Sequence, residues 1–208
     1  MTIIHEAPQY VVVCKAAGED SEHDVPRMLA EQNGNQITDY YVVHRLDKAA
    51  AGLLVLARTR QAAADLSRQV TENALRKTYR CVVAGVPEPT SGVMQDLLYK
   101  DKIKQKMFPV KRKRAGVKEA SLSYHVLQSE DMITLVEVEL QTGRFHQIRC
   151  QFAARKMPLL GDGKYGSRVH CPHLALFCNT LSFYDAKEKK ECCFTAEPPA
   201  EFPWTLFK

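Results

Sequence analysis

The chain has 208 residues, 45% of them apolar, so it can bury a sizeable core and is not globally disordered. Its formal net charge of +5 favours an anionic partner. No apolar run approaches the roughly 20 residues that cross a bilayer, so we expect no membrane partner.

Seven cysteines are scattered along the chain, and no secretory leader opens it. An odd and dispersed set indicates reduced thiols and a cytoplasmic protein. Residues 170–173, with Cys178, Cys192 and Cys193 beyond them, raise a zinc site as the alternative. Their spacing lacks a Cys-x2-Cys pair, and adjacent cysteines on a strand point to opposite faces. We therefore expect no metal.

Apolar patterns predict strands and helices in chain order. Residues 53–57 are apolar on both faces, which is typical of a central strand. Thr59 can cap a helix to about residue 70, and Asp24 can cap an earlier one over residues 24–32, where Asn33-Gly34 is a stop signal. The remaining predictions are strands at 10–15, 77–85, 120–128, 132–141, 174–184 and 191–196, and a helix at 144–155 capped by Thr142.

Strands outnumber helices in this prediction, and neighbouring strands often form hairpins. That pattern is typical of an α+β fold with a mixed, mostly antiparallel sheet and flanking helices. We expect one domain over residues 1–208, an ordered loop at 158–166, and a C-terminal tail anchored by Trp204. A Gly-rich phosphate loop and a dinucleotide fingerprint are both missing, so we expect no nucleotide cofactor.

A strongly basic segment covers residues 100–118, with nine cations in nineteen positions and one opposing carboxylate, Asp101, before Glu119. Its first four lysines alternate, so on one strand they would share a face. One interpretation is a solvated hairpin whose lysines discourage edge pairing. The other, which the charge density favours, is an insertion that binds phosphates.

Three short motifs carry candidate chemistry. They are residues 44–47 (His-Arg-Leu-Asp), 77–79 (Lys-Thr-Tyr) and 143–149 (Gly-Arg-Phe-His-Gln-Ile-Arg). Taken alone, Arg45 and Asp47 could form a surface ion pair, and Tyr79 could be a packing residue. The cations of the third motif would open the predicted helix, against its macrodipole, which suggests an anion nearby.

Together these motifs resemble the RluA-type family of RNA pseudouridine synthases. Residues 52–55 after the first motif, and residues 158–162 with 165–166 after the third, match the same family. The resemblance implies the pseudouridine synthase fold and an isomerase that flips a uridine out of structured RNA, tRNA or rRNA. It implies no cofactor, and we expect a monomer because nothing in the sequence requires an oligomer.

The resemblance also implies residue roles. Asp47 is the catalytic carboxylate, and it attacks the ribose, attacks the base, or deprotonates the sugar. Arg149 pairs with Asp47 and keeps it ionised, since a nearby opposite charge favours the charged form. Tyr79 stacks on the uracil and could assist loss of the C5 proton, and Arg45 fills the gap left by the flipped base. RNA-binding residues are expected at His44, Arg45, Arg144, His146, Lys104, Lys106, Lys111, Arg112, Lys113 and Arg114.

The sequence departs from the family at residues 48–51, where Lys-Ala-Ala-Ala replaces a run that is usually polar. Lost hydrogen bonds there could affect rate or substrate preference. Only 43 residues precede the first motif, so we expect a short form without an N-terminal RNA-binding domain. Asp162 is interpreted as a loop-structuring residue with an Asx-type hydrogen bond. An RNA-binding or RNA-folding protein without catalysis is the alternative function.

Overall fold

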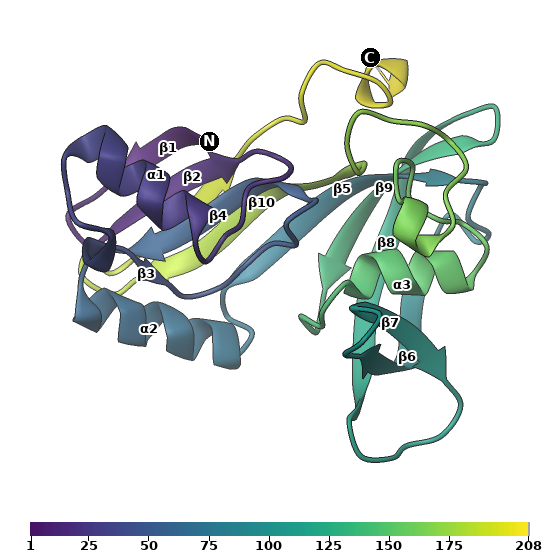
Figure 1. Cartoon of the computed structure of the whole chain (residues 1–208), viewed down its shortest axis with the longest axis horizontal. Coiled ribbons are helices and arrows are strands. Elements are labelled where there is room, and N and C mark those ends of the chain that lie inside the picture. The colour runs from purple at the N-terminus through teal and green to yellow at the C-terminus, as the bar shows by residue number, and fades with distance from the viewer. Residues whose placement is uncertain (208) are drawn as a thin grey trace. The chain divides into compact units, whose positions relative to one another are not determined.

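A computed structural model describes residues 1–207 (Figure 1). The chain divides into two compact units. The first consists of Met1–Lys77 and Phe177–Glu197, and the second of Thr78–Leu176 with the segment that begins at Pro198. A division into compact units does not show whether either unit folds on its own. A single catalytic domain over residues 1–208 is therefore kept as a proposal.

The sheet of the first unit is mixed. Its strand order is β1-β2-β4-β10-β11, with β3 also on β4, and β4 pairs in parallel with β10 while the other pairs are antiparallel. Residues 53–57 of β4 are fully buried, which confirms the predicted central strand. The elements are β1 (Thr2–Glu6), β2 (Tyr10–Lys15), α1 (Asp24–Asn33), β3 (Tyr41–Val42), β4 (Ala51–Ala57), α2 (Arg60–Thr71), β10 (Leu176–Asp185) and β11 (Lys190–Thr195).

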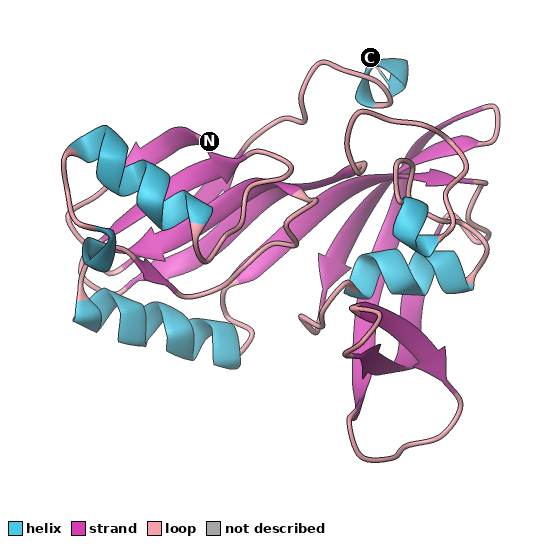
Figure 2. Ribbon diagram, viewed as in Figure 1, coloured by secondary structure: helices cyan, strands magenta, loops and turns pink. Residues whose placement is uncertain are grey.

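The second unit carries an antiparallel sheet in the order β5-β9-β8-β6-β7. Figure 2 shows helix α3 beside these strands, and Gln151 of α3 donates to the Met94 carbonyl of β6 at 3.1 Å. Trp204 packs against a core cluster that includes Val82 and Leu160, so it is the anchor that was predicted. The elements are β5 (Arg76–Ala84), β6 (Ser91–Asp101), β7 (Lys106–Val110), β8 (Val117–Glu130), β9 (Ile133–Leu140), α3 (Gln147–Ala154) and the 3-10 turns Gly163–Tyr165 and Trp204–Phe207.

Two of the predicted helix-end residues, Thr59 and Gly34, act as predicted, whereas Asp24 does not. Thr59 accepts the Ala62 N–H at 3.2 Å, and Gly34 ends α1 in the left-handed region at φ 64°, both as predicted. Asp24 is not a cap: it lies inside α1, and its carboxylate accepts the Asp20 N–H at 2.8 Å.

The third predicted helix starts late. Thr142 does not cap it: its oxygen accepts the Ser121 N–H at 2.9 Å, its hydroxyl donates to the Gln147 side chain at 2.7 Å, and the N-cap position is His146. His146 lies in the left-handed region at φ 48°, which keeps residues 143–146 outside α3. Of the cations in the third motif, only Arg149 therefore stands in the first turn of the helix.

The fold class is α+β with mostly antiparallel strands, as predicted. Among residues 1–207, none of the helices has the length and apolar character that crossing a bilayer demands.

Candidate functional site

The Asp47 loop is built on backbone hydrogen bonds. The Asp47 carbonyl accepts the Ala50 N–H at 2.9 Å, and the Lys48 carbonyl accepts the Gly18 N–H at 2.8 Å. Gly52, the second residue of β4, lies so close to β10 that a Cβ there would clash with the backbone of Cys178. Asp47 itself is half-buried, at the point where this turn leads into β4.

Lys15, which local sequence patterns did not single out, supports this loop by hydrogen bonds from its side chain to loop carbonyls. It ends β2 with no exposed surface, and the three N–H groups of its ammonium are shared among four backbone carbonyls. The acceptors are Ala16 at 2.9 Å, Glu19 at 2.8 Å, Lys48 at 3.3 Å and Ala50 at 2.6 Å. Burial lowers the pKa of Lys15 to about 8, against the opposing effect of carboxylates that include Glu19 and Asp47.

This arrangement accounts for the departure at residues 48–51. The loop is supported through main-chain carbonyls, which any residue supplies, so the alanine side chains cost it none of the hydrogen bonds described above. The sequence feature that could have identified Lys15 is a lysine at the end of an apolar strand, just before a turn.

We expect Lys15→Met to loosen the loop, since buried carbonyls lose their donor at a cost of about 1–3 kcal/mol each. Amide hydrogen exchange at Ala50 and Gly18 should accelerate at least about tenfold. Lys48→Met, at an exposed neighbouring position, is the control and should leave both rates unchanged. Equal protection in Lys15→Met and wild type would contradict this role.

The two other residues of the first motif differ in exposure. His44 is 7% exposed, and its Nε2 accepts the Val55 N–H at 3.2 Å, so the proton of the neutral ring lies on Nδ1. Nδ1 is buried and has no hydrogen-bond partner among the described residues. Arg45 is exposed and pairs with Glu22 at 3.2 Å.

Tyr79 and Arg149 belong to the second unit. Tyr79 is 5% exposed on β5, in register with Val138 of β9. Arg149 is 6% exposed, and its Nε and Nη2 donate to the two oxygens of Asp162 at 2.7 and 2.8 Å. This is a buried bidentate ion pair, the geometry that orients a guanidinium most firmly.

The predicted role of Asp162 was wrong in its chemistry. Its side chain makes no capping bond to the 3-10 turn that follows, and binds Arg149 instead. Asp162 still joins the loop to α3, but through a buried charge pair and not an Asx turn. Loop composition alone could not show this, because the partner lies thirteen residues earlier in the chain.

His146 lies in a buried stack. Its ring packs on Phe145 with centroids 3.8 Å apart, and its Nδ1 lies 3.2 Å from the Tyr165 hydroxyl. That hydroxyl also accepts the Met107 N–H at 2.8 Å. Burial, then the charge of Arg149, lowers the pKa of His146 to about 3.

Both buried histidines predict acid sensitivity. Burial also holds the pKa of His44 well below its usual value. Below about pH 6.5 these histidines bind protons in the unfolded chain but stay neutral in the folded one. The free energy of unfolding therefore falls as the pH drops, by up to about 1.4 kcal/mol per pH unit for each ring. Denaturant titrations at pH 7 and pH 5 should show this loss. His146→Gln should reduce it and exposed His5→Gln should not; identical losses in all three proteins would contradict the prediction.

The basic segment forms a hairpin and the turn after it. Lys100 is on β6, Lys106 is on β7, and Lys102 and Lys104 lie in the intervening turn. The prediction that these four lysines share one face of a single strand was therefore wrong. Lys106 donates to the Lys164 carbonyl at 2.6 Å, which fixes it against the 3-10 turn of the same unit.

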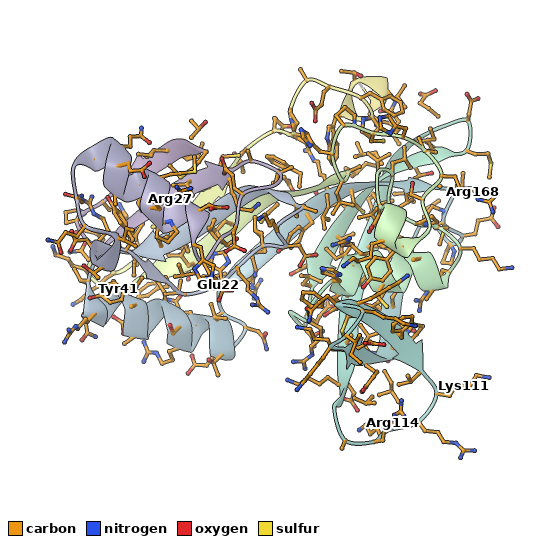
Figure 3. All side chains as sticks on the ribbon, viewed as in Figure 1. Glu22, Arg27, Tyr41, Lys111, Arg114 and Arg168 are labelled. Atoms are coloured by element: carbon orange, nitrogen blue, oxygen red, sulfur yellow. The ribbon has the colours of Figure 1, made fainter. Side chains whose placement is uncertain are left out.

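The second basic block, residues 111–114, lies beyond β7, and all four of its residues are exposed. Figure 3 shows Lys111 and Arg114 pointing away from the rest of this unit. Lys113 pairs with Glu119, and Arg114 lies 5.0 Å above the Tyr99 ring. Arg144 donates to the Glu119 carbonyl at 2.9 Å.

All seven cysteines are free thiols. Within the described part of the chain, no group of three His, Cys, Asp or Glu side chains could hold a metal ion.

Comparison with known proteins shows which family has this fold and these three motifs. The RNA pseudouridylate synthase family model matches residues 9–154. The chain belongs to this family, which confirms the predicted resemblance.

Relatives include an uncharacterized RNA pseudouridine synthase of Aquifex aeolicus, 35% identical over 77% of this chain and 54% of that protein. Another is ribosomal large subunit pseudouridine synthase D of Zymomonas mobilis, 33% identical over 80% of this chain and 55% of that one. The chain thus spans about half the length of these curated relatives. The solved structure of human RNA pseudouridylate synthase domain containing 4 covers 99% of this chain and 91% of its own, with a TM-score of 0.82 and 25% identity.

Proposed function

We propose that this chain is an RNA pseudouridine synthase, an isomerase that converts a specific uridine of structured tRNA or rRNA to pseudouridine. The observation that carries the proposal is the family match over residues 9–154, which contains Asp47, Tyr79 and Arg149. The name of the Zymomonas relative favours ribosomal RNA. The chain is proposed to act as one cytoplasmic, monomeric domain without a cofactor.

In this proposal Asp47 is the catalytic carboxylate. Its loop is held by Lys15 through the main chain, which is the rigidity that a reacting group needs. Tyr79 supports the flipped uracil by stacking. The exposed Arg45 fills the gap that the flipped uridine leaves in the base stack of the RNA. Extrusion of the base costs a few kcal/mol, which contacts between cations and phosphates can offset.

Arg149 is proposed to orient Asp47. The Asp162 carboxylate accepts from Nε and Nη2 of Arg149 and compensates the charge of the guanidinium. Arg149 would therefore act on Asp47 through its fixed orientation more than through net positive charge. The pairing of Arg149 with Asp162 supports this role because it leaves the guanidinium one orientation.

Tritium release from RNA carrying 5-³H-uridine tests the function. The substrates are tRNA and ribosomal RNA from cells that lack this gene, so that the target uridine is unmodified. Release by the wild-type protein is expected from one of the two pools. Tight binding without release from either pool would favour the alternative, an RNA-binding or RNA-folding protein.

We expect the second basic block to supply part of the RNA affinity. Replacing Lys111, Arg112, Lys113 and Arg114 with alanine should weaken binding and reduce the slope of log K against log salt by about 0.7–0.9 for each phosphate that is no longer neutralised. Filter binding over a range of salt concentrations measures this. Alanine at Lys187, Lys189 and Lys190, exposed lysines of the first unit, is the control. An unchanged slope in the block variant would exclude these residues from the interface.

A further inference from the structure

The turn between β6 and β7 presents the most exposed of the large hydrophobic side chains in the described structure. Ile103 is 96% exposed, against 67% for Met132, the next in order. Single exposed apolar residues are common on protein surfaces and need no explanation by themselves. Three further features of this turn set Ile103 apart.

The first feature is rigidity. The Asp101 carboxylate accepts the N–H groups of Ile103 and Lys104, both at 2.9 Å. The Gln105 side chain donates to the Lys102 carbonyl at 2.6 Å and so closes the turn. The isoleucine is therefore held outward by the loop itself, although burial of its side chain would be favourable.

The second feature is attachment to the body of the unit. Lys164 donates to the Gln105 carbonyl at 3.1 Å, and Lys106 donates to the Lys164 carbonyl at 2.6 Å. These reciprocal bonds tie the turn to the segment that also carries Asp162 and Tyr165. A side chain on this turn keeps a fixed position relative to Arg149 within the same unit.

The third feature is charge. Lys102 and Lys104 flank Ile103, and both are exposed. Met132 offers the opposite case, since it follows Glu130 and Asp131 at the turn between β8 and β9. An apolar side chain between two cations fits a partner that has anions on either side of an apolar surface, which describes the stacked bases of RNA between their phosphates.

We propose that Ile103 is an apolar wedge that contacts RNA bases, while Lys102 and Lys104 contact the adjacent phosphates. Aliphatic side chains act in this way when they insert between base steps and partly unstack them. The inference rests on the proposed function, since it assumes an RNA substrate. It adds a contact that depends on apolar area and not on charge.

The test is binding of tRNA and ribosomal RNA from cells that lack this gene, measured over a range of salt for wild type and variants. Ile103→Ser should weaken binding about tenfold with the salt slope unchanged, because the cations that neutralise phosphates all remain. Ile103→Met should retain near wild-type affinity, since its side chain is apolar and of similar size. Met132→Ser, at the acidic turn, is the matched control and should bind as wild type does.

Affinity within twofold of wild type for Ile103→Ser would overturn the proposal. Sedimentation with anionic phospholipid vesicles that Ile103→Ser alone abolishes, with RNA affinity intact, would assign the turn to a lipid surface and also overturn it. Tritium release by wild type in the same RNA keeps the two proposals separate. Turnover with no effect of Ile103→Ser rejects the wedge alone, whereas the expected weakening of binding without turnover rejects only the enzyme.

Discussion

Asp47→Asn is expected to abolish tritium release from the substrate RNA, with a loss on the order of a thousandfold or more. The amide keeps the size of the side chain but cannot act as a nucleophile or a base. The Asp47 carbonyl still accepts the Ala50 N–H, so the turn should persist. The measurement is single-turnover release with enzyme in excess, together with RNA binding.

Asp65→Asn, on helix α2, is the control and should retain full activity. The variant Asp47→Asn should keep the free energy of unfolding of wild type within about 1 kcal/mol, which separates a chemical loss from a folding loss. Release by Asp47→Asn at a rate comparable to wild type would remove Asp47 from the chemistry.

Asp162→Ala is expected to destabilise the protein by about 3–5 kcal/mol, because the Arg149 charge is left buried without this partner. Both side chains are almost inaccessible, so water cannot replace the missing carboxylate. Denaturant unfolding at pH 7 measures the change. We expect activity to fall as well, under conditions in which the variant remains folded, because the guanidinium loses its fixed orientation.

Two comparisons make this prediction specific. Asp65→Ala breaks a partly exposed ion pair with Arg68 and should cost no more than about 1 kcal/mol. The double variant Asp162→Ala/Arg149→Met should be more stable than Asp162→Ala alone, since the buried guanidinium is removed together with its Asp162 partner, yet should stay inactive. A double variant with wild-type activity would show that neither residue serves the reaction.

Local sequence patterns were sufficient for the elements whose partners are near in the chain. The β-branched run at β2, the apolar run at β4 and the Thr59 cap of α2 depend on neighbouring residues, and the structure confirms each. The predicted start of the third helix was wrong. There a tertiary hydrogen bond between Thr142 and Ser121 of β8, and the left-handed His146, override the local signal.

The sequence by itself determined the family and the fold class, and it indicated candidate catalytic residues, because short motifs in a set order carry that information. Only the tertiary structure decided which groups support them. Lys15 meets the carbonyl of Ala50, thirty-five residues away, and Asp162 meets Arg149 across a loop. A buried charge must find its partner in space, and spacing along the chain does not record which one it finds.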